Sequence, residues 1–200
     1  MSESWLQACD AWRIYSEEMA ALSRHLDPAT WAALMAELRG CKGKIVVTGV
    51  GTSGIAARKI AHMLACVERP AIYLNATDAA HGDLGFVGPD DLVIMLSRGG
   101  NSEELTRLLP GLAMKDTPIL CVTENPSPAI ALASRLVIST GVQREIDPLN
   151  MLATTSIVLV LAIFDAACAC LMSESGYTKE TLLAVHPGGD VGLTLRKKAP

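Results

Sequence analysis

Aromatic side chains are scarce in this sequence. They account for 4% of its 200 residues, whereas hydrophobic residues of all kinds account for 50%. The core must therefore be built from aliphatic side chains and alanine, which is typical of helices packed on a parallel sheet rather than of a β-sandwich. The chain is long enough to bury one sizeable core, so we expect a single domain.

Positive charge is scarce as well. The sequence has 17 Lys and Arg residues against 21 Asp and Glu residues, which gives a net charge of −4, and no basic run occurs. Nonspecific nucleic-acid binding depends on clustered basic side chains, so no nucleic-acid partner is expected. The N-terminal residues have neither the basic region nor the apolar region of a signal peptide, so we expect a cytoplasmic protein.

Paired cysteines and an uninterrupted membrane span are also missing. The six cysteines form no C-x-x-C pair, so neither disulfides nor a zinc knuckle is indicated.

The longest apolar run, residues 156–172, contains Asp165 and is shorter than the ~20 uncharged residues of a membrane span. It predicts a buried helix and no membrane partner. A helix that is apolar on nearly all sides must be covered on most of them, so this run points to a homo-oligomer.

The hydrophobic pattern along the chain predicts a regular α/β order. Helical spacing covers residues 4–39, where Asp27 and Pro28 have the sequence of an N-cap followed by a first helical residue. Strands are then expected at 44–49, 71–74, 91–97, 118–123 and 135–140, and helices at 53–67, 103–114 and 128–133. This alternation predicts parallel strands in a three-layer α/β/α sandwich. A polar loop, 141–150, precedes the apolar helix.

The first predicted strand ends in a glycine loop. Gly51, Thr52 and Ser53 lie between Gly49 and Gly54 and run directly into a helix. A helix N-terminus approached by glycines offers N–H groups to a phosphate. The loop also matches G-x-G-x-x-G, but a dinucleotide site needs an acidic residue at the end of the second strand, which instead reads Asn-Ala-Thr-Asp at 75–78. A phosphate site, a dinucleotide site and a plain structural turn remain open at this point.

A second loop with glycines and hydroxyls follows the third predicted strand. It contains Ser97, Gly100, Asn101 and Ser102. In open parallel sheets the ligand lies beyond the carboxyl ends of the strands, so the two loops are expected to face one crevice. Hydroxyls and backbone N–H groups bind phosphate oxygens. No Walker lysine is present, so the pair of loops predicts a site for a small phosphorylated ligand.

At this point the sequence resembles a known family. The segments CKGKIVVTGVGTSGIAARK, AAHGDLGFV, EIDPLNMLATTS and HPGGDVG are similar to the sugar isomerase (SIS) domain, and more narrowly to the arabinose-5-phosphate isomerase family. The resemblance implies a five-stranded, flavodoxin-like doubly wound SIS sandwich. It also implies a sugar phosphate ligand and a homotetramer with active sites at subunit interfaces. We expect N-terminal helices at 1–40, the SIS domain at 41–185, a C-terminal segment at 186–200, and a short form without the CBS pair of larger relatives.

The resemblance also implies the chemistry. Aldose and ketose phosphates interconvert through an enediol, which needs a base and a second acid or base. By resemblance Glu145 is the base, His186 assists ring opening or enediol formation, from the same or a neighbouring subunit, and His81 positions substrate hydroxyls. A solvated ion pair or a structural turn is the alternative for each. Thr154 and Ser156 bind phosphate or simply cap the apolar helix. No cofactor is expected.

Four positions depart from the family pattern, one of them Gly99, which stands in the second glycine loop where Ser is usual. Thr52 stands where the family has Lys, Asn101 stands where it has Glu, and Asn75 replaces a His that binds zinc in some relatives, so no metal is expected. Asn101 cannot accept a proton at neutral pH. Arg98 either restores positive charge near the phosphate or points to solvent. Two hypotheses follow, a true isomerase with altered substrate preference and a phosphosugar-binding module without turnover.

Overall fold

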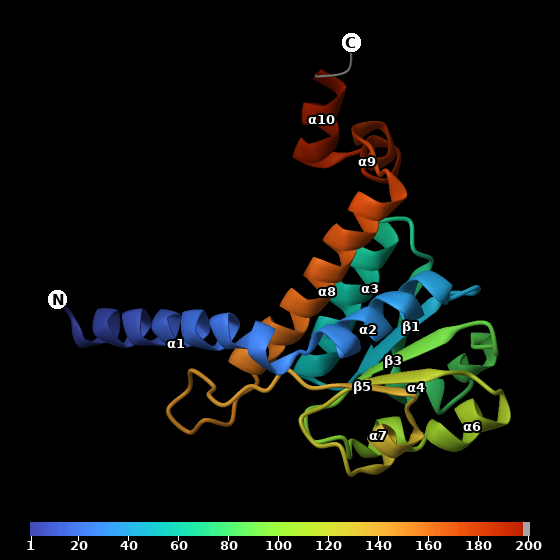
Figure 1. Cartoon of the computed structure of the whole chain (residues 1–200), viewed down its shortest axis with the longest axis horizontal. Coiled ribbons are helices and arrows are strands. Elements are labelled where there is room, and N and C mark those ends of the chain that lie inside the picture. Colours follow the sequence, from blue (N-terminus) through green and yellow to red (C-terminus); the bar gives the residue numbers. More distant parts are fainter. Residues whose placement is uncertain (198–200) are drawn as a thin grey trace.

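Strands and helices alternate along most of the chain (Figure 1). The computed structural model describes residues 1–197. Its strands are β1 (Ile45–Gly49), β2 (Ala71–Asn75), β3 (Leu92–Leu96), β4 (Ile119–Val122) and β5 (Leu136–Ile138). Its helices are α1 (Glu3–His25), α2 (Pro28–Gly40), α3 (Thr52–Cys66), α4 (Ala76–Ala79), the 3-10 helix η1 (Asp83–Phe86), α5 (Glu103–Thr106), α6 (Leu109–Met114), α7 (Ala129–Ala133), α8 (Thr155–Ser175), α9 (Lys179–Val185) and α10 (Gly189–Lys197).

The strands form one parallel sheet in the order β2-β1-β3-β4-β5. The strand order reverses between β1 and β3. Gly49, at the end of β1, pairs with Asn75 on one side and with Leu96 on the other. The loops after these three strands therefore leave the same edge of the sheet, where open parallel sheets bind ligands. The predicted doubly wound fold with five parallel strands is confirmed.

Apolar side chains cover both faces of the sheet, because successive strand residues point to opposite sides. In β1, Ile45 and Val47 join a hydrophobic cluster with α2, α3 and α8, whereas Val46 joins a second cluster with α4, α5, α6 and α7. Strands β3 and β4 alternate in the same way. The result is a three-layer arrangement, with helices on each side of the sheet (Figure 1).

Most predicted elements are present, but one helix is not continuous. Asp27 caps α2 as predicted, since its carboxylate accepts the N–H groups of the next helical turn. The single helix predicted at 103–114 is wrong. It is split into α5 and α6, which flank residues 107 and 108. Pro110 has no N–H to donate to the carbonyl of Thr106, so the first helix cannot continue through it.

Helix α8 is the most apolar element. It has the length and composition of a membrane-spanning helix, yet half of its apolar span is buried inside the protein. Phe164 and Ala167 are fully buried against the core, and an ion pair from Asp165 to Lys59 joins the helix to α3 beside it (Figure 1). One side of α8 is therefore core, and the other is only partly covered by its own chain.

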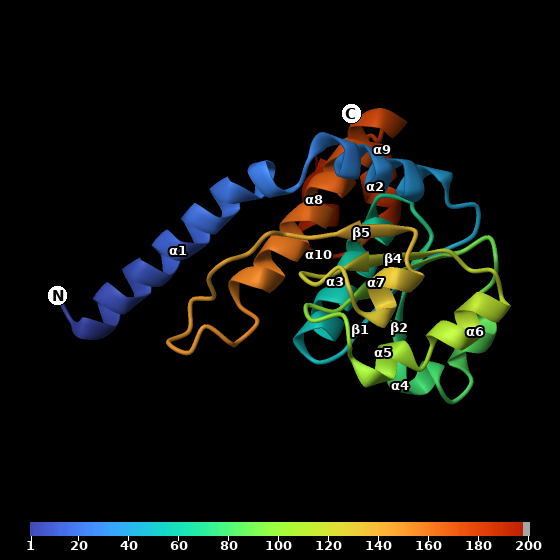
Figure 2. The ribbon, with the colours of Figure 1, turned by 60° about the horizontal axis from the view of Figure 1, so that its bottom comes forward.

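The two N-terminal helices differ in how they contact the rest of the chain. Helix α1 extends away from the sheet in both views (Figures 1 and 2) and buries only Ile14 and Glu18. The Glu18 carboxylate accepts the backbone N–H of Gln143 at 3.1 Å and so ties α1 to the loop after β5. Helix α2 instead packs three residues into the core, Leu34, Met35 and Leu38.

Asp91 anchors the start of β3. It is 4% exposed and accepts the backbone N–H and the ammonium of Lys44, at 2.8 and 2.7 Å, and the N–H of Gly88 at 2.8 Å. Burial raises the pKa of Asp91, but the bonds from Lys44 and Gly88 outweigh burial, so the pKa lies below its ordinary value. The resulting stability is complete above the unfolded pKa of about 3.9 and is lost as pH falls through the lower folded pKa.

We expect Asp91→Asn to lower the free energy of unfolding at neutral pH by roughly 1–3 kcal/mol, because buried donors lose their charged acceptor. The variant should also lose part of the steep acid dependence of stability below about pH 4. Urea unfolding at neutral and acid pH measures both effects, with the exposed neighbour Asp90→Asn as control. Equal acid sensitivity of Asp91→Asn and wild type would contradict this role.

Candidate functional site

The first glycine loop brings β1 and α3 into close contact. A Cβ on Gly49 would lie 2.8 Å from the backbone of Ser53, and one on Gly54 would lie 2.8 Å from the carbonyl oxygen of Gly49. Gly51 has φ +58° and is the N-cap of α3, which no side chain of the described residues caps. Two glycines thus permit the close approach and the third makes the turn, and the first turn of α3 can receive an anion.

The end of β2 carries an amide rather than a carboxylate. Asn75 uses its side-chain oxygen to accept the N–H groups of Thr77 and Asp78, at 2.9 and 3.3 Å, and so caps α4. Asp78 lies inside this short helix. The dinucleotide alternative therefore finds no carboxylate at the position where it requires one for the ribose.

The second glycine loop places two hydroxyls side by side. The Oγ atom of Ser97 lies 3.0 Å from the Oγ atom of Ser102 and accepts the N–H of Gly100 at 3.1 Å. Gly100 has φ +71°, and a Cβ on it would lie 2.3 Å from the Cγ atom of Pro128. Only glycine fits this tight loop, which follows the end of β3 directly.

A small cavity of about 30 Å³ lies between the two loops and the N-terminus of α8. Its lining includes Ser53, Ser97, Arg98 and Ser156. Ser156 is 5% exposed, and its hydroxyl has no hydrogen-bond partner among the described residues. A buried polar atom without a partner costs free energy, so this hydroxyl is suited to a ligand that supplies the missing bond.

Glu145 lies in the loop between β5 and α8, and its side chain is fully buried. Oε2 accepts the N–H and the hydroxyl of Thr154, both at 2.9 Å, and the N–H of Ser156 at 3.1 Å. Oε1 pairs with the guanidinium of Arg98 at 2.7 Å. The carboxylate therefore occupies the N-terminus of α8, where the helix dipole stabilises negative charge.

These contacts fix the charge state of Glu145. Burial raises the pKa of its carboxyl group, but hydrogen bonds from Ser156 and Thr154 outweigh burial, so the pKa lies below its ordinary value. Glu145 is therefore ionised at neutral pH. The N–H groups of Thr154 and Ser156 and the Thr154 hydroxyl are committed to it. The Ser156 hydroxyl lies beside the same carboxylate without a partner within 3.5 Å among the described residues, so it can donate to Glu145 or to a ligand.

The two predicted histidines lie in different places. His186 is at the far end of α3 from the first glycine loop, where its Nε2 atom lies 3.5 Å from the Sγ atom of Cys66. Helix α3 has 15 residues and is therefore about 22 Å long. His81 is exposed one short helix beyond the end of β2. Within one chain, Glu145 and His186 cannot touch the same small molecule.

The remaining predicted residues of the two loops do not line the cavity. Gly51, Thr52 and Asn101 are exposed at the binding edge of the sheet. Two residues that the sequence analysis missed, Thr123 and Glu124, do line the cavity. Both follow β4, and nothing in their local sequence distinguishes them from ordinary residues at the end of a strand.

A comparison with models of known protein families identifies the family of this chain. The model of the SIS domain matches residues 37–170. The chain belongs to the SIS domain family. The matched segment contains both glycine loops, Glu145 and the start of α8, and it ends before His186. The SIS domain predicted from the sequence motifs is confirmed.

Curated relatives of this SIS protein are arabinose 5-phosphate isomerases. KdsD of Escherichia coli strain K12 is 39% identical over 155 residues, which cover 78% of this chain and 47% of that protein. GutQ of the same strain is 35% identical over 158 residues, which cover 79% of this chain and 49% of that protein. The chain thus spans about half the length of the curated relatives it matches.

Solved structures match over nearly the whole SIS chain. A crystal structure of a Listeria monocytogenes protein has 38% identity and a TM-score of 0.90, covering 94% of this chain and 100% of that one. The protein c3406 of Escherichia coli CFT073, in complex with arabinose 5-phosphate, has 30% identity and a TM-score of 0.83, with the same coverage.

Proposed function

We propose that this SIS protein interconverts the aldose and ketose forms of a sugar phosphate of the arabinose 5-phosphate type. One observation carries the proposal: a buried hydroxyl without a partner, on Ser156, lies beside the ionised carboxylate of Glu145 at the sheet edge where both glycine loops meet. The relatives named arabinose 5-phosphate isomerase and the complex of c3406 with that sugar phosphate support this choice of substrate.

The phosphate group is assigned to the two glycine loops and the start of α8. Ser97 and Ser102 supply neighbouring hydroxyls, and Ser53 and Ser156 line the small cavity together with Ser97. The first turn of α3 has no side-chain cap from the described residues. Hydroxyls and helix N–H groups bind a phosphate dianion without net positive charge. This arrangement suits a protein with a net charge of −4.

Proton transfer is assigned to Glu145. After ring opening, the ionised carboxylate removes the proton from C2 of the aldose while O1 gains a proton from a second acid or from solvent, which gives the enediol. The Glu145 carboxyl group then returns its proton to C1, and O2 gives its proton back to that second group or to solvent, so that the net change moves one hydrogen from C2 to C1 and one proton from O2 to O1. C1 and C2 exchange oxidation states within one molecule, so the step needs no external oxidant or reductant. The His81 ring is assigned to the sugar hydroxyls, because its exposed position follows the end of β2.

The site is proposed to be shared between subunits. Helix α8 has 21 residues and is about 30 Å long, with Glu145 at its start and His186 beyond its end. If His186 assists ring opening, it must come from a second chain. The oligomer proposed from the sequence, a tetramer, supplies one.

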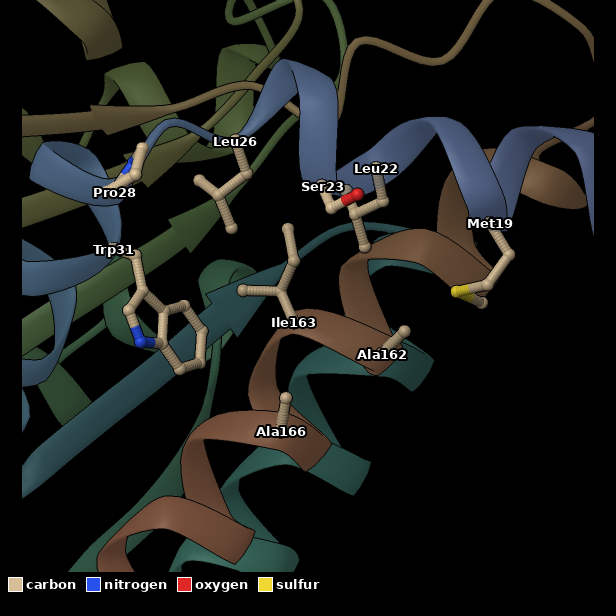
Figure 3. Close-up of a pocket in the computed structure, with 9 residues that line it drawn as sticks. All are labelled: Met19, Leu22, Ser23, Leu26, Pro28, Trp31, Ala162, Ile163 and Ala166. Carbon is tan, nitrogen blue, oxygen red and sulfur yellow. The ribbon is translucent and has the colours of Figure 1, made fainter.

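Three apolar surfaces support such an assembly. Helix α1 exposes Trp5 and Trp12, at 50% and 56%, and the loop after Glu145 exposes Leu149 and Met151, at 76% and 75%. An apolar groove of about 430 Å³ lies between α1, α2 and α8 (Figure 3). Its lining residues are Met19, Leu22, Ser23, Leu26, Pro28, Trp31, Ala162, Ile163 and Ala166.

A mixing experiment tests the shared site. Glu145→Gln and His186→Ala should each be inactive alone. Co-expressed, they should regain activity, up to about one quarter of wild type for random assembly, because some interfaces then pair an intact Glu145 with an intact His186. Isomerase assays on the co-purified hybrids measure the gain. No gain in hybrids whose mixed composition is verified by mass spectrometry, or a clean monomer in analytical ultracentrifugation, would contradict the shared site.

A second candidate function is phosphosugar binding without turnover. It is favoured by one observation: both carboxylate oxygens of Glu145 are already bonded. Thr52 and Asn101 replace two catalytic residues of the family. Because neither supplies a charge or a base, they also favour binding without turnover.

Turnover separates the two candidates. Purified protein is incubated with arabinose 5-phosphate and other pentose and hexose phosphates in D2O, and conversion and deuterium incorporation are followed by NMR. An isomerase exchanges the C2 proton of at least one of these compounds and converts it. Binding by calorimetry without exchange across the panel would exclude the isomerase and leave the binding module.

A further inference from the structure

Arg98 covers Oε1 of Glu145 from the second glycine loop. The Glu145 side chain is 0% exposed, whereas the Arg98 side chain that pairs with it is 40% exposed. The guanidinium therefore lies on the solvent side of the carboxylate. A base in this state cannot reach a carbon-bound proton until one of its oxygens is released.

The two oxygens of Glu145 are held differently. Oε2 is bonded to Thr154 and Ser156 at the start of α8, whose positions are set by a long, packed helix. Among the described residues, Oε1 is bonded only to the long, partly exposed side chain of Arg98. The backbone carbonyl of Arg98 accepts the Thr123 hydroxyl and the Glu124 N–H, both at 3.0 Å, so the loop is fixed independently of the side chain. Oε1 is thus the oxygen that can be released, by motion of one side chain.

A phosphate can cause this release. Arg98 directly follows Ser97 in the second glycine loop and lines the same cavity. A guanidinium binds phosphate through two parallel hydrogen bonds, so a dianion at this loop competes with Glu145 for Arg98. The cavity of about 30 Å³ has room for about one water molecule. A phosphate group that occupies this space must therefore move a lining side chain. Leu96 and Val122 belong to the core, and Glu124 is held by hydrogen bonds from Thr140 and Gly141, so Arg98 is the lining side chain best placed to move.

We propose that Arg98 is a positioning residue that couples phosphate binding to the release of Glu145. Without phosphate, Arg98 holds Oε1 and masks the base. With phosphate in the loops, Arg98 turns to the dianion, and Oε1 faces the sugar carbons. This proposal rests on the proposed function only for its kinetic consequence. The exchange of ion-pair partners itself requires a phosphate site and no turnover.

NMR of the protein tests the coupling without any reaction. In wild type labelled with 13C at the glutamate carboxyl carbons, the Glu145 signal, assigned by its loss in Glu145→Gln, should shift on addition of inorganic phosphate at constant pH. In Arg98→Met the phosphate-dependent shift should be absent, and in the exposed control Arg107→Met it should be unchanged. No shift in wild type with saturating phosphate, or a shift that survives in Arg98→Met, would overturn the proposal.

Kinetics test its consequence for specificity. With unphosphorylated arabinose, phosphite dianion should activate wild-type isomerisation by at least about tenfold. Phosphite takes the place of the phosphate group that this substrate lacks, so it binds Arg98 and releases Oε1 of Glu145. Arg98→Met should lose this activation, and Arg98→Lys, which keeps the charge but not the paired donors, should retain part of it. Activation of Arg98→Met equal to wild type would overturn the coupling. Inactivity of every variant on every sugar, with the NMR response intact, would instead refute the isomerase and leave the coupling standing.

Discussion

Glu145→Gln is expected to lower kcat for sugar phosphate isomerisation by about 10²–10⁴-fold, the usual contribution of a positioned general base. The carboxylate is buried, ionised and held at the start of α8, and an amide in its place cannot accept the C2 proton. Steady-state kinetics and deuterium incorporation at C2 should fall together. Phosphate affinity by calorimetry should change much less, because the serine hydroxyls remain.

The matched control is Glu103→Gln, an equally small change at an exposed ion pair on α5, which should leave kcat unchanged. Glu145→Gln should also lose some stability. The new NH2 group must face either Arg98 or the Thr154 and Ser156 donors, so at least one buried donor loses its acceptor, which costs roughly 1–3 kcal/mol. Assays are therefore run well below the melting temperature of the variant. Exchange at C2 that persists at the wild-type rate in folded Glu145→Gln would contradict the base assignment.

The strands were predictable because the pattern that marks them is local. A strand buried on both faces is a continuous apolar, β-branched run, and the runs predicted at 44–49 and 91–97 contain β1 and β3. Short helices have no such pattern. The four residues each of α4 and η1 make about one turn, too little for a 3.6-residue period to be visible, and the interruption near Pro110 depends on one missing N–H.

The candidate site was predictable to the extent that its residues lie at the ends of strands. The two glycine loops could be placed because parallel strands end at one edge. The ion pair of Arg98 with Glu145 joins residues 47 positions apart, and its existence depends on how the loop after β5 folds over α8. The position of His186 depends on the length and direction of α8 together. Tertiary packing sets both, and no local pattern encodes them.

Phe164→Ala is expected to lower the free energy of unfolding by about 3–5 kcal/mol, the usual cost of truncating a buried aromatic residue. Phe164 is fully buried in α8, within the cluster formed with α2, α3 and the sheet. With only 4% aromatic residues, the core has few side chains of comparable size to fill the cavity. Domains are stable by about 5–15 kcal/mol, so thermal unfolding at fixed protein concentration should show a fall of roughly 10 °C.

Leu132→Ala is the control, because Leu132 is 76% exposed on α7 and should change stability by no more than about 0.5 kcal/mol. Equal shifts for the two variants would show that α8 is not packed as described.

The loss of stability in Phe164→Ala also affects the functional site. Glu145 is held by the first residues of α8, so loosening this helix moves the carboxylate as well. In Phe164→Ala, isomerase activity should therefore decline at a lower temperature than in wild type, in parallel with unfolding, because one helix serves both the core and the site.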